Sequence, residues 1–81
     1  MSAVVVPFPA IRRRRFIRRH AALMSTLSPV AADRHLRRQL RIQTDAMERK
    51  QIDRVLIDQQ RAMLEQAIRT ELKRLTAVGV A

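Results

Sequence analysis

One glycine and three prolines are the only strong helix breakers in this chain of 81 residues. Pro7 and Pro9 lie near the N-terminus, so between Ala10 and Val78 only Pro29 remains. The rest is rich in residues of high helix propensity, such as Ala, Leu, Arg and Gln. Hydrophobic residues make up 47% of the sequence, which is usual for a folded protein. We therefore expect an all-α protein of one domain with a thin core.

Hydrophobic periodicity indicates a helical domain over residues 10–78 that follows an extended arm, residues 1–9. Its three helices should cover about residues 10–26, 29–50 and 54–77. Ser28 is a good N-cap and Pro29 suits the first position of the second helix. Lys50 and Arg54 interrupt a continuous apolar seam, which favours a turn with Asp53 as the next N-cap. A helical hairpin, or a long helix in a coiled-coil oligomer, is the alternative.

Each expected helix has one apolar face. The three faces contain Phe16, Ile17, His20, Leu23, Met24 and Leu27; then Ala32, Leu36, Leu40, Ala46 and Met47; then Leu56, Ile57, Met63, Leu64, Ala67, Ile68 and Leu75. The third face is wide enough to cover a second subunit as well, so a homo-oligomer is one possible assembly. His20 should be a core histidine with one satisfied nitrogen. Glu71 should pair with an arginine at the rim of the core or, alternatively, with His20.

Arginines dominate the stretch R-R-R-R-F-I-R-R, residues 12–19, and no acidic residue precedes Asp33. The formal net charge is +10, and it is concentrated towards the N-terminal side. On a helical wheel, Arg14, Arg15, Arg18 and Arg19 lie opposite the apolar face, while Arg12 and Arg13 fall in the first turn. Arg34, Arg37, Arg38 and Arg41 share the polar face of the second helix. The pairs Asp33–Arg37, Arg41–Asp45 and Asp45–Arg49 have the i,i+4 spacing of ion pairs and could neutralise part of that face.

The residues needed for most site chemistry are missing from the sequence. There is no cysteine, and a single glycine cannot build a loop that cradles phosphate. His20 and His35 are fifteen residues apart and lack the spacing of a metal pair. We therefore expect no enzyme activity, no metal and no cofactor. No hydrophobic run approaches the 18 residues of a membrane span, so we expect no such span. The lack of cysteine fits a reducing compartment, and we expect a cytoplasmic protein. The Arg-rich start also resembles a transit peptide, although cleavage would remove part of the predicted core.

The arginine-rich face is the candidate site because rows of guanidinium groups suit phosphate oxygens. The sequence predicts a small basic accessory protein that binds nucleic acid non-specifically. The predicted contacts are Arg12, Arg13, Arg14, Arg15, Arg18, Arg19, Arg34, Arg37, Arg38 and Arg41. The chain has no Tyr or Trp, and Phe16 should be buried, so base stacking is limited. Two alternatives are docking of an acidic protein, with Val5, Pro7 and Phe8 of the arm in contact, and binding to anionic lipid.

The opening V-V-P-F-P-x-x-R-R-R-x-F-I-R-R-H, residues 5–20, resembles a family of small uncharacterised bacterial proteins of the alphaproteobacterial type. The resemblance continues through L-S-P, residues 27–29, and H-L-R-R-Q-L, residues 35–40, to A-I-R-T-E-L, residues 67–72. It implies a small helical protein of bacterial origin and supplies no activity. The family pattern has a glycine near position 51 where this chain has Gln51, which leaves the sharpness of the second turn open.

Overall fold

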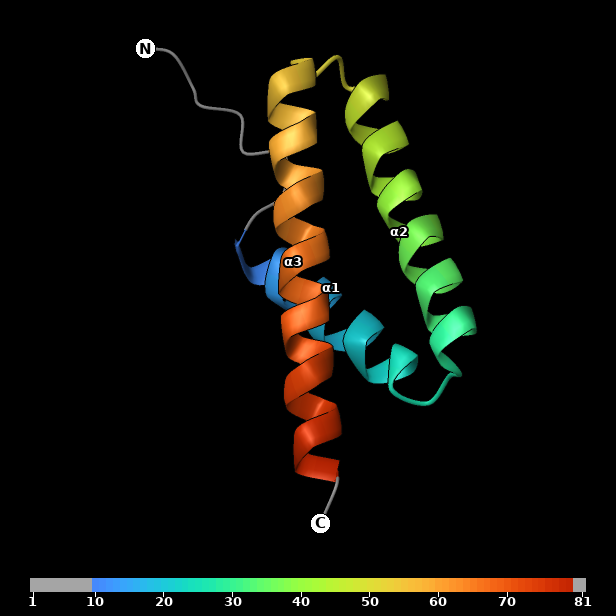
Figure 1. Cartoon of the computed structure of the whole chain (residues 1–81). Helices are drawn as coiled ribbons and strands as arrows, with labels where there is room; N and C mark the ends of the chain where they lie inside the picture. The colour runs from blue at the N-terminus through green and yellow to red at the C-terminus, as the bar shows by residue number, and fades with distance from the viewer. Residues whose placement is uncertain (1–9, 80–81) are drawn as a thin grey trace.

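Three separate helices make up the fold in a computed structural model that describes residues 10–79 (Figure 1). They are α1 (Ala10–Met24), α2 (Pro29–Arg49) and α3 (Arg54–Gly79). No strand occurs within this range. The predicted all-α, three-helix fold is confirmed, and the alternative of one long helix is wrong because the chain turns back after Arg49. The predicted arm, residues 1–9, lies outside the described residues.

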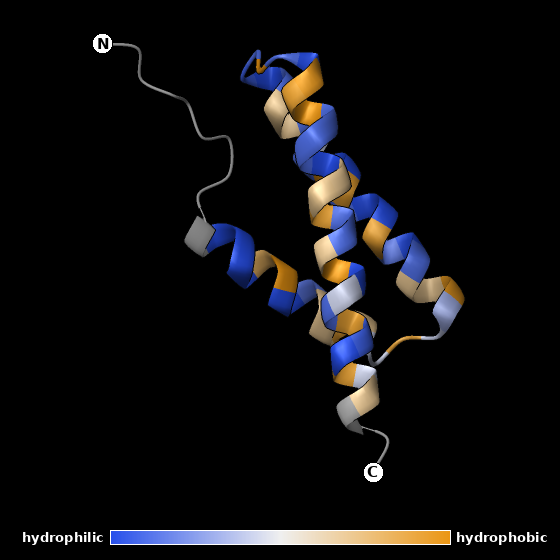
Figure 2. Ribbon diagram, turned by 60° about the vertical axis from the view of Figure 1, so that its left-hand side comes forward, coloured by the Kyte–Doolittle hydropathy of each residue, from blue (hydrophilic) through white to orange (hydrophobic). Residues whose placement is uncertain are grey.

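The helices α2 and α3 run antiparallel side by side, and α1 crosses them obliquely (Figures 1 and 2). The end of α1 that leads into α2 packs against the other two helices. Its first turns diverge from α2, as the side view in Figure 2 shows, while Arg13 still contacts Met63 of α3. Orange positions, which mark hydrophobic residues, recur along α2 and α3 at helical spacing in the same view. The oblique crossing of α1 is the feature that shapes the candidate site.

The core consists of one main cluster, to which all three helices contribute. Its buried members are Phe16, Ala21 and Met24 from α1, Ala32, Leu36 and Leu40 from α2, and Leu64 and Ile68 from α3. Met47 and Ile57 are also buried but lie outside this cluster, nearer the α2–α3 turn. The predicted burial of Phe16 is confirmed. Leu23 was also predicted to be on the apolar face, yet its exposed fraction is 45%. The other two helices cover a narrower part of the α1 surface than the helical wheel predicts.

The start of α2 has the predicted cap. Ser28 adopts an extended backbone, its Oγ accepts a hydrogen bond from the backbone N–H of Ala31 at 3.3 Å, and Pro29 occupies the first helical turn. This bond satisfies one of the four N–H groups that a helix start leaves without a partner. The cap therefore fixes the residue at which α2 begins after the α1–α2 connection.

The turn between α2 and α3 depends on a left-handed residue. Gln51 has a φ of 58°, and its N–H donates to the carbonyl of Glu48 at 2.9 Å. The N–H of Ile52 donates to the carbonyl of Met47 at 3.2 Å. This pair of bonds is a Schellman motif, in which glycine is the preferred left-handed residue. Asp53 then caps α3 by accepting from the N–H of Val55 at 3.2 Å, as predicted.

Replacing Gln51 with glycine should stabilise the protein. A side chain at positive φ costs about 1–2 kcal/mol, and the extra entropy that glycine loses on folding is about 0.5–1 kcal/mol. We therefore expect Gln51→Gly to raise the free energy of unfolding by about 0.5–1 kcal/mol, measured by urea denaturation. Gln51→Ala is the matched control and should change it little, because alanine keeps the Cβ. Equal stability of the two variants would contradict this account.

Candidate functional site

A pair of histidines joins α1 to α2 at the edge of the core. The Nδ1 atom of His20 lies 2.8 Å from the Nε2 atom of His35, a hydrogen-bond distance. The ring of His20 also contacts that of Phe16, with centroids 4.4 Å apart. His20 is only 7% exposed, and its Nε2 has no hydrogen-bond partner among the described residues. The prediction of a buried histidine with one satisfied nitrogen is confirmed.

Burial and charge both keep His20 neutral. Burial lowers the pKa of His20 most, because removal from water disfavours the imidazolium form. The neighbouring His35 and the Arg19 guanidinium lower it further, to about 4. With His20 neutral, one of the two facing nitrogens can carry the shared hydrogen and the other can accept it. His20 is therefore neutral at physiological pH, and a single hydrogen lies between the two rings.

Sequence reasoning missed this contact because fifteen residues separate the two histidines. One signal could have found it. The connection between α1 and α2 is short: His20 lies about one helical turn before it, and His35 lies between one and two turns after it. His20 is on the apolar face of its helix, and His35 directly precedes the buried Leu36. Residues at similar distances from a tight helical connection face one another across the hairpin.

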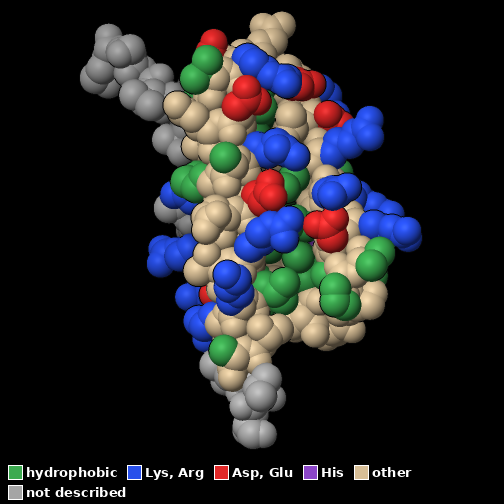
Figure 3. Space-filling view, in the orientation of Figure 1, with side chains coloured by type: hydrophobic (Ala, Val, Ile, Leu, Met, Phe, Trp, Pro, Cys, Tyr) green, Lys and Arg blue, Asp and Glu red, His purple; other side chains and the backbone are tan. Residues whose placement is uncertain are grey.

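Ion pairs divide the arginines into two groups. The first group forms ion pairs and lies on α2 and α3: Arg37, Arg54, Arg69 and Arg74. The carboxylates that pair with these arginines are Asp33, Glu48, Asp58, Glu65 and Glu71. On the face drawn in Figure 3, basic and acidic side chains accordingly alternate over α2 and α3. Within residues 10–79, no carboxylate pairs with an arginine of the stretch 12–19. The densest run of arginines without an ion pair is thus on α1.

The predicted ion pairs of α2 are present only in part. Arg37 Nε lies 3.0 Å from Asp33 Oδ2, as the i,i+4 spacing predicted. Asp33 also accepts from Arg69 of α3, at 3.3 Å. The predicted pairs of Asp45 with Arg41 and Arg49 are wrong, since neither contact occurs in the part of the chain that the structure describes. Arg34, Arg38 and Arg41 are exposed and form no ion pair there.

The structure decides between the two partners predicted for Glu71, an arginine and His20. It accepts hydrogen bonds from Arg74, whose Nε lies 3.1 Å from each carboxylate oxygen. The hydrogen bond from Arg74 holds the pKa of Glu71 below its usual value, and the charges of Arg74 and Arg18 act in the same direction. The rim position with an arginine partner is confirmed. The alternative pairing with His20 is wrong, because His20 faces His35 instead.

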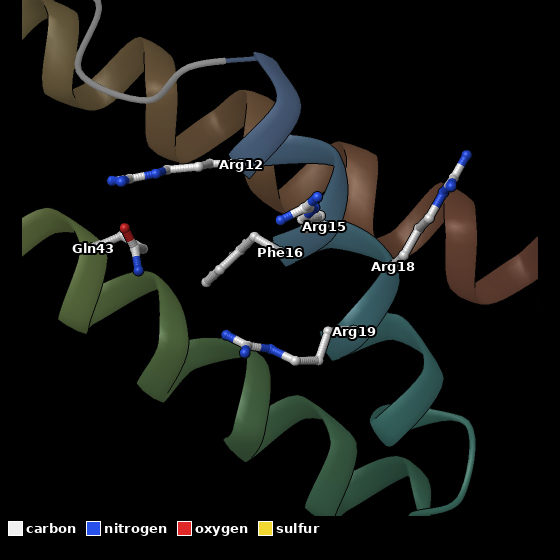
Figure 4. Close-up of a pocket in the computed structure, with 6 residues that line it drawn as sticks. All are labelled: Arg12, Arg15, Phe16, Arg18, Arg19 and Gln43. Carbon is white, nitrogen blue, oxygen red and sulfur yellow. The ribbon is translucent and has the colours of Figure 1, made fainter.

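A hollow of about 700 Å³ lies where α1 diverges from α2. Its lining residues are Arg12, Arg15, Phe16, Arg18 and Arg19 from α1 and Gln43 from α2. Figure 4 shows that Arg12, Phe16 and Arg19 extend from α1 towards α2, with Phe16 between the two arginines and Gln43 facing them, while Arg18 points away from α2. Four arginines and no carboxylate are among its lining residues, so the charge around this hollow is positive. The oblique angle of α1 creates it, which the wheel could not predict.

The remaining predicted arginines do not join the hollow. Arg13 faces α3 and donates to the sulfur of Met63 at 3.5 Å. Arg14 is exposed. A second hollow, of about 290 Å³, lies between α3 and the α1–α2 connection and contains the Asp33–Arg69 pair. Because a carboxylate balances its arginine, the second hollow offers no comparable positive charge. The docking residues predicted in the arm, Val5, Pro7 and Phe8, lie outside the described residues.

Neither a metal centre nor a membrane-crossing helix is present in the described part of the chain. No group of three or more His, Asp or Glu side chains there is arranged to hold a metal ion. No helix within residues 10–79 is long and apolar enough to cross a membrane.

The chain is a member of the family of unknown function DUF6074, whose profile matches residues 1–81. No curated protein and no solved structure shows significant similarity to it. The resemblance to an uncharacterised family is thereby confirmed at the level of the family.

The histidine pair predicts loss of stability in weak acid. Because the pKa of His20 is about 4 in the folded chain and 6.5 in the unfolded chain, the unfolded state binds more protons between those values. Stability present above pH 6.5 is therefore lost as the pH falls towards 4. We expect a loss of about 1–2 kcal/mol between pH 7 and pH 5, measured by urea denaturation at each pH. In His20→Leu this loss should largely disappear, and a variant that keeps the full pH dependence would refute the assignment.

Proposed function

We propose that the protein is a small basic accessory protein of the bacterial cytoplasm that binds nucleic acid non-specifically. The arginines of α1 contact the phosphate backbone, and Arg34, Arg38 and Arg41 of α2 extend the contact. Arg37 contributes less, because Asp33 already neutralises it. The observation that carries the proposal is the lack of any ion pair to the α1 arginines among the described residues, where most carboxylates are already paired.

The density of this charge favours a polyanion as the partner. Residues 12–19 span about 12 Å along the helix axis, because each residue rises 1.5 Å. Six charges over that length are about one per 2 Å, which is close to the one charge per 1.7 Å of duplex DNA. A small anion would neutralise one or two of these groups. A phosphate backbone neutralises several at once and releases its condensed counterions in doing so.

The chemistry of the contact supports binding without sequence preference. Guanidinium groups bind phosphate oxygens in pairs and read no base from that position. The chain has no Tyr or Trp. The helix α1 is also short. Its arginines are not aligned in one row of polar side chains that could contact base edges in a major groove. Affinity should therefore come from phosphate contacts and depend steeply on salt.

Removing two exposed α1 charges should reduce the salt dependence of binding. Each phosphate contact contributes a slope of about 0.9 in a plot of log affinity against log salt concentration. We expect Arg14→Gln with Arg18→Gln to lower that slope by about 2, measured by fluorescence anisotropy of a labelled DNA duplex. The matched control is Arg49→Gln with Arg61→Gln, which removes two exposed, unpaired charges from α2 and α3. The control should change the slope much less.

Equal slopes for the two double variants would show that α1 is not the contact surface. Absence of binding at low salt would refute the proposal as a whole. The alternative partner, an acidic protein, would use the same arginines together with the arm. Competition with polyglutamate of equal charge separates the two partners: nucleic acid should displace polyglutamate, and the reverse order would favour the acidic protein.

A further inference from the structure

The interface between α2 and α3 contains a polar layer between two hydrophobic ones. Counted from the turn at residues 50–53, Leu40 on α2 is level with Leu64 on α3, and Met47 is level with Ile57. All four of these side chains are buried. Gln43 and Gln60 occupy the level between the two pairs. The amide oxygen of Gln60 is buried and has no hydrogen-bond partner among the described residues.

The hollow of α1 opens at this same level, because Gln43 is one of its lining residues. The amide of Gln43 points into the space between the helices, with Arg12 and Arg19 on the opposite side (Figure 4). Phe16, which is 6% exposed, supplies an apolar floor. The hollow thus combines guanidinium planes, one amide with both donor and acceptor atoms, and an apolar base. Its volume of about 700 Å³ is within the range of small-molecule sites.

We propose that this hollow receives an unpaired nucleobase, so that single strands bind more tightly than backbone charge alone would allow. The proposal rests on the nucleic-acid binding proposed above. Guanidinium planes of Arg12 and Arg19 stack on the base, and the Gln43 amide bonds to its edge. Because an amide can offer a donor or an acceptor, each of the bases fits, and the binding stays independent of sequence. The flanking phosphates lie against Arg15 and the remaining exposed arginines.

Other ligands would bind fewer of the groups that line the hollow. A duplex keeps its bases stacked inside, so its phosphates would contact the arginine rim and leave Gln43 without a partner. An acidic peptide could place carboxylates on the arginines, but an apolar side chain inserted beside them would also leave the amide unsatisfied. An unpaired base supplies a planar ring and polar edge atoms together, with phosphates attached to it.

The test compares two labelled single strands of equal length and charge, one normal and one with abasic sugars, using the full chain at a fixed salt concentration. Fluorescence anisotropy should show about tenfold tighter binding of the normal strand, the usual size of a stacking contribution. Equal affinity for the two strands overturns the base site and leaves backbone binding intact. Failure of both strands to bind overturns the base site together with the proposed function.

Variants of one glutamine at a time locate the effect. Gln43→Ala should reduce the ratio of affinities between normal and abasic strands several-fold and leave affinity for the abasic strand unchanged. The matched control, Gln66→Ala, changes an exposed glutamine of α3 and should leave the ratio unchanged. If Gln43→Ala preserves the ratio, the hollow is not the base site. An acidic peptide that binds more tightly than the normal strand at equal charge also overturns the proposal. The comparison of strands on the unaltered protein remains decisive if Gln43→Ala fails to fold.

Discussion

The burial of one side of α1 is the constraint on which the candidate site depends. Phe16, Ala21 and Met24 are committed to the core that α2 and α3 complete. Because these side chains fix the rotation of α1 about its own axis, they also fix the side of the helix on which each neighbouring arginine lies. A helix of this length is marginal in water by itself, so its order comes from this packing. The charge of residues 12–19 is therefore presented on a rigid support.

Much of the fold could be predicted because its signals are local. Ser28 and Pro29 start α2 through a cap and a preset φ, and Asp53 starts α3 through a side-chain hydrogen bond. The backbone of Gln51 could not be read from its identity, since glutamine has no preference for positive φ. The Schellman bonds of the helix end impose that conformation. Here the tertiary demand for a sharp reversal overrides the local preference of the residue.

The site could be predicted in its composition but not in its shape. A helical wheel separates Phe16 from most of the arginines correctly, since it depends only on the helical period. It cannot give the angle at which α1 crosses its neighbours. That angle leaves Leu23 exposed, opens the hollow beside Arg19 and brings His20 to His35. Each of these features depends on packing between elements distant in the sequence.

The histidine pair and the hollow share a wall, and this contact couples their charges. Phe16 lies against His20 on one side and lines the hollow on the other. Arg19 also lines the hollow, and its charge is one cause of the lowered pKa of His20. An anion bound at Arg19 weakens that repulsion, so anion binding and protonation of His20 favour one another. Thermodynamic linkage makes the effect reciprocal: a protonated His20 in turn attracts the anion.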